Sequence, residues 1–395
     1  MNEKALIVAL ELGSQYVRAI AGTQQPDGSF KVERIEQTPA DGCIRRGVVY
    51  NIDKTVSAIR RVIELLETRL GVHIDKVYAG IQGQSLRTVG NFIVRSLGSR
   101  VKVDDHIVDA LLQANDETAY PGMETLEVVP QEYKVGLDEP VDPVGIEADS
   151  IEGHYLNIVA RDNIRSNILR CIRAAGLDPL DIFVTPLALA ERLLPETERR
   201  SGCALVDMGA ETTTVLVYTK NILRHMAVIP LGGKNITKDI TTMQVEMEDA
   251  EDLKRRYGRA IDDSAASANA EGVQAHNGII DIDKLHRIIE ARCEEILRNV
   301  IKQIELSHAD DKLPAGIVFT GGAAVIPGLC AAFSKFVAPR EYKVRIAKSL
   351  LSDNELRHAG SGLAGGNYNS LVALLNKGEA DCTAIVTPEP EPEQT

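Results

Sequence analysis

The chain has 395 residues, 44% of them apolar, which is enough for roughly two to four globular domains at about 150 residues each. Its 57 Asp and Glu outnumber its 44 Lys and Arg, and the net charge of −13 would repel phosphate backbones, so we exclude general nucleic-acid binding. The six cysteines form no CxxC pair and the eight histidines show no paired spacing, which disfavours a disulfide framework and a zinc site.

The opening of the chain predicts a three-stranded meander followed by a helix. Residues 5–13 and 16–23 alternate as strands do and are joined by a short Gly-Ser-Gln turn, and a third strand is expected over 30–37. Asp53 then precedes apolar residues that recur on one helical face, and Gly71 follows them. We therefore expect a helix capped by Asp53 and closed by Gly71.

The opening pattern recurs in the second half of the chain. Residues 202–218 again place an apolar strand before an acid, a Gly and small polar residues. Aligning Gly209 with Gly13 gives an offset of 196 residues, about half the chain, which predicts two related halves. Residues 79–161 lie outside this pattern and mix strand-like and helical segments. They predict a small inserted α/β module.

Further segments complete the expected organisation. Apolar periodicity predicts helices over 234–258 and 283–309, and the small polar residues 262–272 predict a mobile loop between them. The end of the chain alternates Pro with Glu and predicts a disordered linker over 381–395.

Three Gly-containing turns follow predicted strands, at residues 11–15, 207–212 and 319–324. A glycine at the end of a strand lets backbone N–H groups approach a ligand, and two facing turns of this kind can hold a phosphate chain. Glu11 and Asp207 each precede a turn glycine by two residues and could hold a hydrated divalent cation, directly or through water. Hairpin geometry alone would explain any single turn, but the ordered set of three is more specific.

This set of turns resembles the actin-like ATPase superfamily. In that comparison ALELGSQYVRA matches the first phosphate loop, ALVDMGAETTT the second, and GIVFTGGAAVIPGL the adenosine motif. Glu251 and Lys254 resemble the ExxK pair that holds the adenosine in DnaK-type chaperones, although an ordinary surface pair would have the same spacing. Arg18 falls where actin carries a phosphate-binding Lys.

Within the superfamily, the chain resembles the FtsA family of bacterial cell-division proteins from about residue 5 to 378. RRGVVYNIDKTVSAI, VVPQEY and RHMAVIPLGGKNITKDI carry the resemblance, and the inserted module falls where that family has its 1C subdomain. The resemblance implies an α/β, actin-like two-lobed fold with duplicated mixed five-stranded sheets. Its expected parts are lobe 1A (1–80, 163–200 and 362–380), subdomain 1C (81–162), lobe 2A (201–228 and 297–361) and subdomain 2B (229–296).

The same resemblance implies that ATP binds with Mg2+ between the lobes. Glu11 and Asp207 would then be ligands of the magnesium or of its waters. The residues expected at the nucleotide are Gly13, Ser14, Gln15, Arg18, Asp207, Gly209, Thr212, Gly233, Glu251, Lys254, Gly321, Gly322 and Ala323.

Two departures from the superfamily bear on this chemistry. Glu211 stands where the second phosphate loop commonly reads GGGT, and its carboxylate would be repelled by phosphates unless a cation or an outward rotamer relieves it. Thr185 and Pro186 stand where related ATPases carry a Glu or Gln that positions the attacking water. We therefore name no catalytic residue and expect at most weak ATPase activity.

The resemblance further implies a protein that polymerises and links the tubulin-like protein FtsZ to the inner face of the cytoplasmic membrane at the division site. Arg292 is expected to bind the FtsZ C-terminal tail, with pairing to Glu294 or Glu295 as the alternative. Later division proteins are expected partners. Members of the family attach to the membrane through an amphipathic helix, and we expect this anchor to be missing because no such segment follows Pro392.

Two other functions stay open. One is a pilus-type actin-like adaptor, which shares the inserted module. The other is a sugar or acetate kinase, or an exopolyphosphatase, of the same superfamily, although residues 79–161 offer only generic carboxylates such as Asp104 and Asp105 for an acceptor site.

Overall fold

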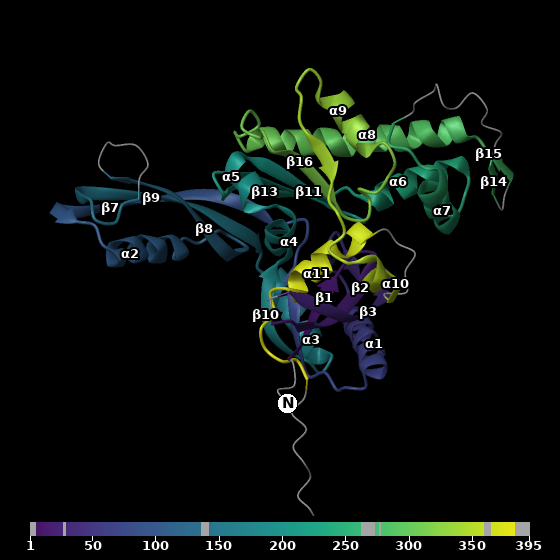
Figure 1. Ribbon diagram of the computed structural model, residues 1–395, viewed down its shortest axis with the longest axis horizontal. Helices are drawn as coiled ribbons and strands as arrows, with labels where there is room; N and C mark the ends of the chain where they lie inside the picture. Colours follow the sequence, from purple (N-terminus) through teal and green to yellow (C-terminus); the bar gives the residue numbers. More distant parts are fainter. Residues whose placement is uncertain are drawn as a thin grey trace, which may run out of the picture.

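The computed structural model describes residues 5–26, 29–135, 142–261, 273–275, 278–358 and 365–383. Two α/β lobes are each built on one sheet, and a narrow module projects from them to the left in Figure 1. The lobe that contains β1 lies below the other in this view, and the long helix α8 (Ile282–Leu306) runs across the upper one.

The first lobe contains a five-stranded sheet of order β10-β6-β1-β2-β3. Its strands are β1 (Leu6–Leu12), β2 (Tyr16–Gln24), β3 (Phe30–Pro39), β6 (Lys76–Ile81) and β10 (Asp178–Val184). The helices packed on it are α1 (Ile52–Leu70), α3 (Asn163–Ala174), α4 (Thr185–Leu193) and α11 (Asn369–Leu375). The central strands are almost continuously buried, as expected for a sheet with helices on its faces.

The second lobe repeats this topology with the strand order β17-β16-β11-β12-β13. Its strands are β11 (Cys203–Met208), β12 (Thr213–Thr219), β13 (Ile222–Ile229), β16 (Gly316–Thr320) and β17 (Val344–Ile346). Its helices include α5 (Glu196–Ser201), α6 (Gly233–Ile240), α7 (Met247–Tyr257), α8 and α9 (Leu329–Val337).

The predicted duplication is confirmed down to single hydrogen bonds. β1 is antiparallel to β2 and parallel to β6, and β11 is antiparallel to β12 and parallel to β16. At the turn of each hairpin the glycine N–H donates to the carbonyl oxygen three residues later, from Gly13 to Tyr16 (3.1 Å) and from Gly209 to Thr212 (2.8 Å). These two bonds are separated by the same 196 residues that relate the sequence motifs.

The inserted module is a three-stranded sheet covered on one side by a helix. It contains β7 (Arg87–Lys102), α2 (Asp105–Asp116), β8 (Met123–Val135) and β9 (Glu147–Arg161). Strand β7 pairs with β13 of the second lobe at Arg87 and Ala227, so the second sheet continues into the module and has eight strands in all. The five strands expected for each lobe are present, but this pairing extends one sheet beyond them.

Short elements complete the described chain. They are β4 (Ile44–Arg45), β5 (Val48–Val49), η1 (Thr241–Met243), β14 (Val273–Ala275), β15 (Gly278–Ile280), α10 (Asp353–His358) and η2 (Gly365–Tyr368).

Two local predictions about helices are wrong. The first helix is capped by Asn51, whose side chain accepts from the N–H of Lys54, and Asp53 lies in the first turn instead. The helix expected over 234–258 is divided into α6, η1 and α7, because Gln244 adopts a left-handed conformation (φ 63°) that ends η1. Helix α1 does end at Gly71 as predicted.

The prediction of a disordered linker over 381–395 is wrong for its first three residues. Residues 381–383 pack on the first lobe: Cys382 is buried, its N–H donates to the carbonyl of Leu6 (2.9 Å), and its sulfur accepts from the N–H of Val8. The expected loop 262–272 and the rest of the expected linker lie outside the described residues.

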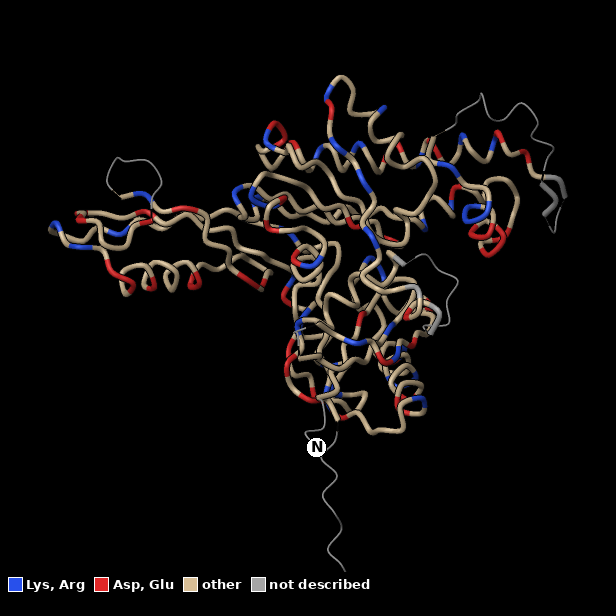
Figure 2. The backbone as a smooth tube through the Cα atoms, in the orientation of Figure 1, with Lys and Arg blue, Asp and Glu red and all other residues tan. Residues whose placement is uncertain are grey.

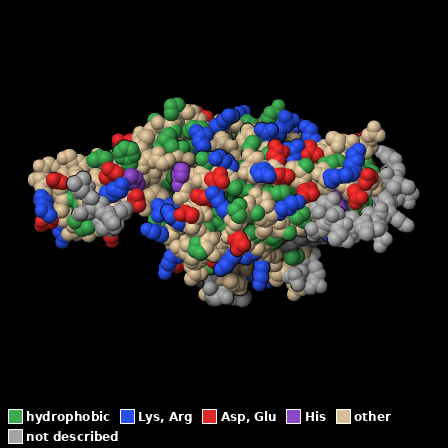
Figure 3. Space-filling view, turned by 90° about the horizontal axis from the view of Figure 1, so that it is seen from above, with side chains coloured by type: hydrophobic (Ala, Val, Ile, Leu, Met, Phe, Trp, Pro, Cys, Tyr) green, Lys and Arg blue, Asp and Glu red, His purple; other side chains and the backbone are tan. Residues whose placement is uncertain are grey.

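Charge is spread over the whole molecule. Figure 2 shows Lys, Arg, Asp and Glu along both lobes and the module, and on the face seen in Figure 3 the two signs are interspersed. A mixed surface of this kind gives no strong long-range attraction to a polyanion. No helix within the described residues combines the length and the apolar character needed to span a bilayer.

We predict that Asn157→Ala destabilises the module. Asn157 is buried, exchanges hydrogen bonds with Asn115 and donates to the Tyr120 hydroxyl (2.8 Å), so truncation leaves buried polar groups unpaired. The expected loss is about 1–3 kcal/mol in the free energy of unfolding, measured in urea. Asn299→Ala, at an exposed helical position, is the control and should change stability by less than about 0.5 kcal/mol. Equal effects of the two variants would contradict the prediction.

Candidate functional site

A pocket of about 690 Å³ lies between the two lobes. The turns of both hairpins line it, together with the segment after β16 and the start of α6. All the residues expected at the nucleotide or its magnesium line this one pocket: Glu11, Gly13, Ser14, Gln15, Arg18, Asp207, Gly209, Thr212, Gly233, Glu251, Lys254, Gly321, Gly322 and Ala323. The fold thus brings together residues from four separate segments of the chain.

The backbone at the pocket packs too closely for side chains. A Cβ on Gly232 would lie 2.6 Å from the carbonyl oxygen of Gly209, and one on Gly321 would lie 2.4 Å from Oδ1 of Asp207. Gly321 also has a φ of +90°, which an L side chain rarely adopts. These glycines let the start of α6 and the segment after β16 approach the second hairpin.

The two hairpin turns present unused backbone donors. The N–H groups of Gly13 and Gly209 donate hydrogen bonds within their own turns. The N–H groups of Ser14, Gln15 and Ala210 have no protein acceptor among the described residues. Free N–H groups that converge at the ends of strands form the kind of concave site that binds anions.

Glu11 and Asp207 occupy equivalent positions at the ends of β1 and β11. Glu11 is buried and accepts from Arg18 Nη1 (3.2 Å) and from the Ser370 hydroxyl. Asp207 has no ion-pair partner within the described residues, and burial, aided by the negative charge of Glu11, raises its pKa to about 7. A cation at this point would relieve the cost of two neighbouring carboxylates.

Glu11 and Asp207 would hold Mg2+ only together with further ligands. The described part of the chain contains no cluster of three or more His, Cys, Asp or Glu that could bind a metal by itself. Waters and phosphate oxygens would have to complete the coordination, which is how Mg2+ is usually bound beside phosphates.

Arg18 is held away from free solvent. Its guanidinium donates to Glu11, to Gln37 (3.2 Å) and to the carbonyl oxygen of Asn367 (3.0 Å), and it lies near the rings of Tyr16 and Tyr368. It lines the pocket, but its charge is already paired with Glu11.

Glu251 and Lys254 form a contact network at the base of α6. Lys254 Nζ donates to Glu251 (2.6 Å), to the Thr237 hydroxyl (2.8 Å) and to the Gly233 carbonyl (3.1 Å). Burial lowers the pKa of Lys254, with Glu251 opposing this shift. The pKa of Glu251 is also lowered, because Lys254 and Thr237 together outweigh the effect of burial, which would raise it. The pair therefore fastens α7 to α6 and is more than a solvated surface pair.

Glu211 meets a cation from within the protein. Its Oε1 accepts from Lys234 Nζ (3.0 Å), and both side chains line the pocket. The sequence raised the need for such a cation but did not identify Lys234. Its position directly after Gly232 and Gly233, at the start of α6, was the available signal.

Other lining residues were also missed. Gln82 directly follows β6, as the identified turn residues follow their strands, and Thr320 is the last residue of β16 and lies in the third predicted turn, but neither was expected at the nucleotide. Thr185, considered as the equivalent of a water-positioning residue, is buried and is not among the residues that line the pocket.

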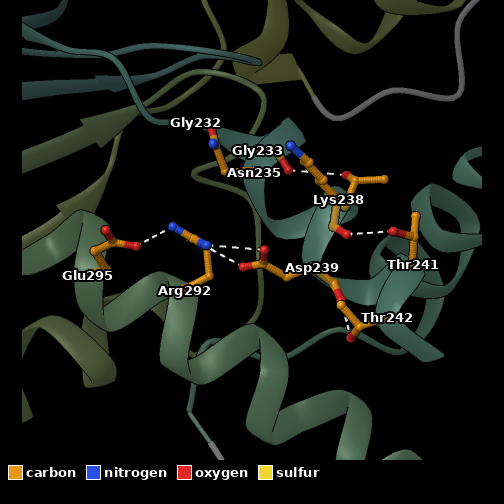
Figure 4. A network of polar contacts seen from close by, with 10 residues as sticks. Gly232, Gly233, Asn235, Lys238, Asp239, Thr241, Thr242, Arg292 and Glu295 are labelled. Carbon is orange, nitrogen blue, oxygen red and sulfur yellow. Dashed lines mark hydrogen bonds and ion pairs between the residues drawn. The ribbon is translucent and has the colours of Figure 1, made fainter.

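Arg292 lies outside the pocket and its cation is already paired. From α8 it donates to both oxygens of Asp239 on α6, at 2.5 and 3.1 Å, and it also bonds Glu295 (Figure 4). Only 24% of its side chain is exposed. The alternative of pairing with Glu295 is therefore present, and Asp239 is a stronger partner that the sequence did not indicate.

We predict that Asp207→Asn removes a pH-dependent loss of stability. With a pKa of about 7 in the folded state and 3.8 as its ordinary value, Asp207 favours folding while protonated, and this contribution is lost as the pH rises toward 7. Relative to the wild type, the variant should gain about 2–3 kcal/mol in the free energy of unfolding between pH 5 and pH 8, at ~1.4 kcal/mol per pKa unit. Urea unfolding with EDTA measures this. Asp252→Asn, at an exposed helix pair, is the control, and a gain that does not depend on pH would refute the assignment.

The sequence matches cell-division proteins over most of its length. The family model described as "Cell division protein FtsA" matches residues 204–364. Cell division protein FtsA of Bacillus subtilis (strain 168) is 32% identical over 339 residues, covering 83% of this chain and 76% of that protein. Cell division protein FtsA of Porphyromonas gingivalis is 28% identical over 392 residues, covering 97% of this chain and 80% of that protein.

Solved structures share the fold at lower identity. A chain of the "PilM-PilN type IV pilus biogenesis complex" has a TM-score of 0.62 at 17% identity, with 95% of this chain and 98% of that chain covered. MreB5 of Spiroplasma citri bound to ADP has a TM-score of 0.54 at 11% identity, with 93% and 94% covered. These structures establish the actin-like fold alone. The sequence matches establish more: the chain belongs to the FtsA family of cell division proteins.

Proposed function

We propose that this chain binds ATP with Mg2+ in the pocket between its lobes. The observation that carries the proposal is the pair of equivalent hairpin turns, whose free N–H groups face one pocket from two halves of the chain. Phosphates would lie between these turns, since backbone donors at strand ends favour anions. Glu11 and Asp207 would hold the magnesium through water.

The adenosine end is assigned to the far side of the same pocket. Glu251 and Lys254, with the Gly321–Ala323 segment, would hold the ribose and base as the family resemblance implies. Val325 and Ile326, which follow this segment in the sequence, also line the pocket, and their apolar side chains would offer a surface for a base. The magnesium and the backbone N–H groups of the two turns would neutralise the negative charge of the nucleotide's phosphates.

Turnover is proposed to be weak. Thr185 is not among the residues that line the pocket, and Pro186 has no side-chain group that could polarise a water molecule. We therefore assign nucleotide a structural role in holding the lobes, with chemistry as a slow secondary step.

In the cell, we propose that the protein polymerises and tethers the FtsZ ring to the cytoplasmic membrane. Membership of a cell-division family supports this over the pilus-type adaptor and the kinase or exopolyphosphatase. Self-association through the projecting module, a membrane-bound amphipathic helix and contacts with later division proteins rest on the family resemblance. So does the division into subdomains 1A, 1C, 2A and 2B, to which the strand pairing gives support.

Arg292 is our proposed contact for the FtsZ tail. It bridges α6 and α8 through Asp239, and a carboxylate of an acidic peptide can replace Glu295 beside it without leaving a buried charge unpaired. Binding of the peptide would thus require that one of its carboxylates takes the place of Glu295 beside Arg292.

We predict that ATP binds when magnesium is present and that Asp207→Asn weakens this binding. Isothermal titration calorimetry of ATP into the wild-type chain should give a single site, and removal of one of the two acids should lower the affinity at least tenfold with Mg2+. Asp252→Asn should bind as the wild type does. Absence of heat and of any thermal shift with ATP or ADP would refute the proposed function.

We predict that Arg292→Gln weakens binding of an FtsZ tail peptide by tenfold or more while ATP affinity stays unchanged. Arg298→Gln is the matched control, because Arg298 lies on the same helix in an exposed pair with Glu294. Fluorescence anisotropy of a labelled peptide measures both. Wild-type affinity in the Arg292 variant, or equal loss in both variants, would move the contact elsewhere.

A further inference from the structure

The ion pair between Glu211 and Lys234 lies in the second lobe, and each of its members also contacts the first lobe. Glu211, in the second hairpin turn, accepts from the backbone N–H of Arg46 in the first lobe (2.7 Å). Lys234, at the start of α6, donates to the carbonyl oxygen of Ser14 in the first hairpin turn (2.7 Å). The pair itself is closed at 3.0 Å. Each partner thus contacts the opposite lobe while it contacts the other partner.

The ammonium of Lys234 stands between the two turns that face the pocket. The ammonium donates to the carbonyl oxygen of Ser14 and to Glu211, and the backbone N–H of Lys234 donates to the carbonyl oxygen of Ala210 (2.7 Å). Its side chain remains 36% exposed and lines the pocket. An anion bound between the two hairpin turns would therefore contact the Lys234 ammonium.

Glu211 is held independently of Lys234. One of its oxygens is engaged by the Arg46 N–H, in a loop where Gly47 in turn donates to the Ser14 hydroxyl (2.9 Å). The carboxylate therefore stays beside the turns when Lys234 moves. Left without its cation it would repel each added phosphate, and this repulsion grows with the charge of the ligand.

We propose that Lys234 exchanges Glu211 for the terminal phosphate of a nucleoside triphosphate, so that the pair distinguishes ATP from ADP. The inference rests on the proposed nucleotide site. In the absence of a third phosphate, the ammonium bonds Glu211 and Ser14, and the lobes are joined through the pair. A terminal phosphate between the turns offers a stronger, doubly charged acceptor, which takes the ammonium from the carboxylate.

The two members of the pair should then act in opposite directions. Lys234→Met removes the cation and leaves Glu211 facing the phosphates, so the triphosphate loses more affinity than the diphosphate. Glu211→Gln removes the repulsion between the carboxylate and the phosphates and leaves Lys234 without its ion-pair partner. The affinity for the triphosphate should therefore increase more than the affinity for the diphosphate. Lys234→Arg keeps the positive charge and should retain most of the discrimination.

The test is the ratio of the dissociation constants of ADP and the non-hydrolysable analogue AMPPNP, measured by calorimetry with Mg2+. We expect Lys234→Met to lower the preference for AMPPNP about tenfold and Glu211→Gln to raise it several-fold, as one charge in a partly screened site would. Lys31→Met and Glu33→Gln, from an ion pair of 2.9 Å whose residues are not among those lining the pocket, are the matched controls and should leave the ratio unchanged.

The outcomes separate this inference from the nucleotide site itself. If the wild type binds both nucleotides and the variants shift ADP and AMPPNP by equal factors, the role of the pair is refuted and the nucleotide site stands. If the wild type binds neither ADP nor AMPPNP, the nucleotide site and the role of the ion pair are both refuted. If Lys234→Arg behaves as Lys234→Met does, shape rather than charge sets the preference and the proposed exchange is wrong.

Discussion

The site depends on how closely backbone segments approach one another around the pocket. Gly232 brings the start of α6 against the carbonyl of Gly209, and Gly321 brings the segment after β16 against Asp207, at distances that leave no room for a Cβ atom. These approaches place free N–H groups, two carboxylates and a helix start within one pocket. A single methyl group at either glycine would push apart the elements on which every other contact of the site relies.

The positive charges at the pocket are already engaged within the protein. Arg18 is paired with Glu11, Lys254 with Glu251 and Lys234 with Glu211. A charged ligand therefore binds by exchanging partners and not by filling an unpaired site, which makes its affinity a difference between two sets of ion pairs. Of the two acids at the strand ends, Asp207 has no ion-pair partner within the described residues, and burial together with the negative charge of Glu11 raises its pKa.

Patterns within single segments predicted most of the fold, and contacts between distant segments supplied the rest. The strand-acid-glycine motif repeats along the chain, so the two hairpins and the two related halves could be predicted, and the family resemblance implied the duplicated sheets and the nucleotide residues. Lys234 was missed because its contacts join segments far apart in the sequence: Glu211 lies 23 residues before it in the same lobe, and Ser14 lies in the other lobe. The break of the long helix at Gln244 was missed for another reason: no Gly or Pro marks it in the sequence.

A crystal structure with Mg2+ and AMPPNP tests the central claim that one nucleotide is held jointly by the two halves of the chain. The account predicts phosphate oxygens within hydrogen-bond distance of the backbone N–H groups of both turns, around Ser14 and Ala210, with the base beside Lys254. Phosphates that contact only one turn, or a nucleotide bound outside this pocket, would contradict it.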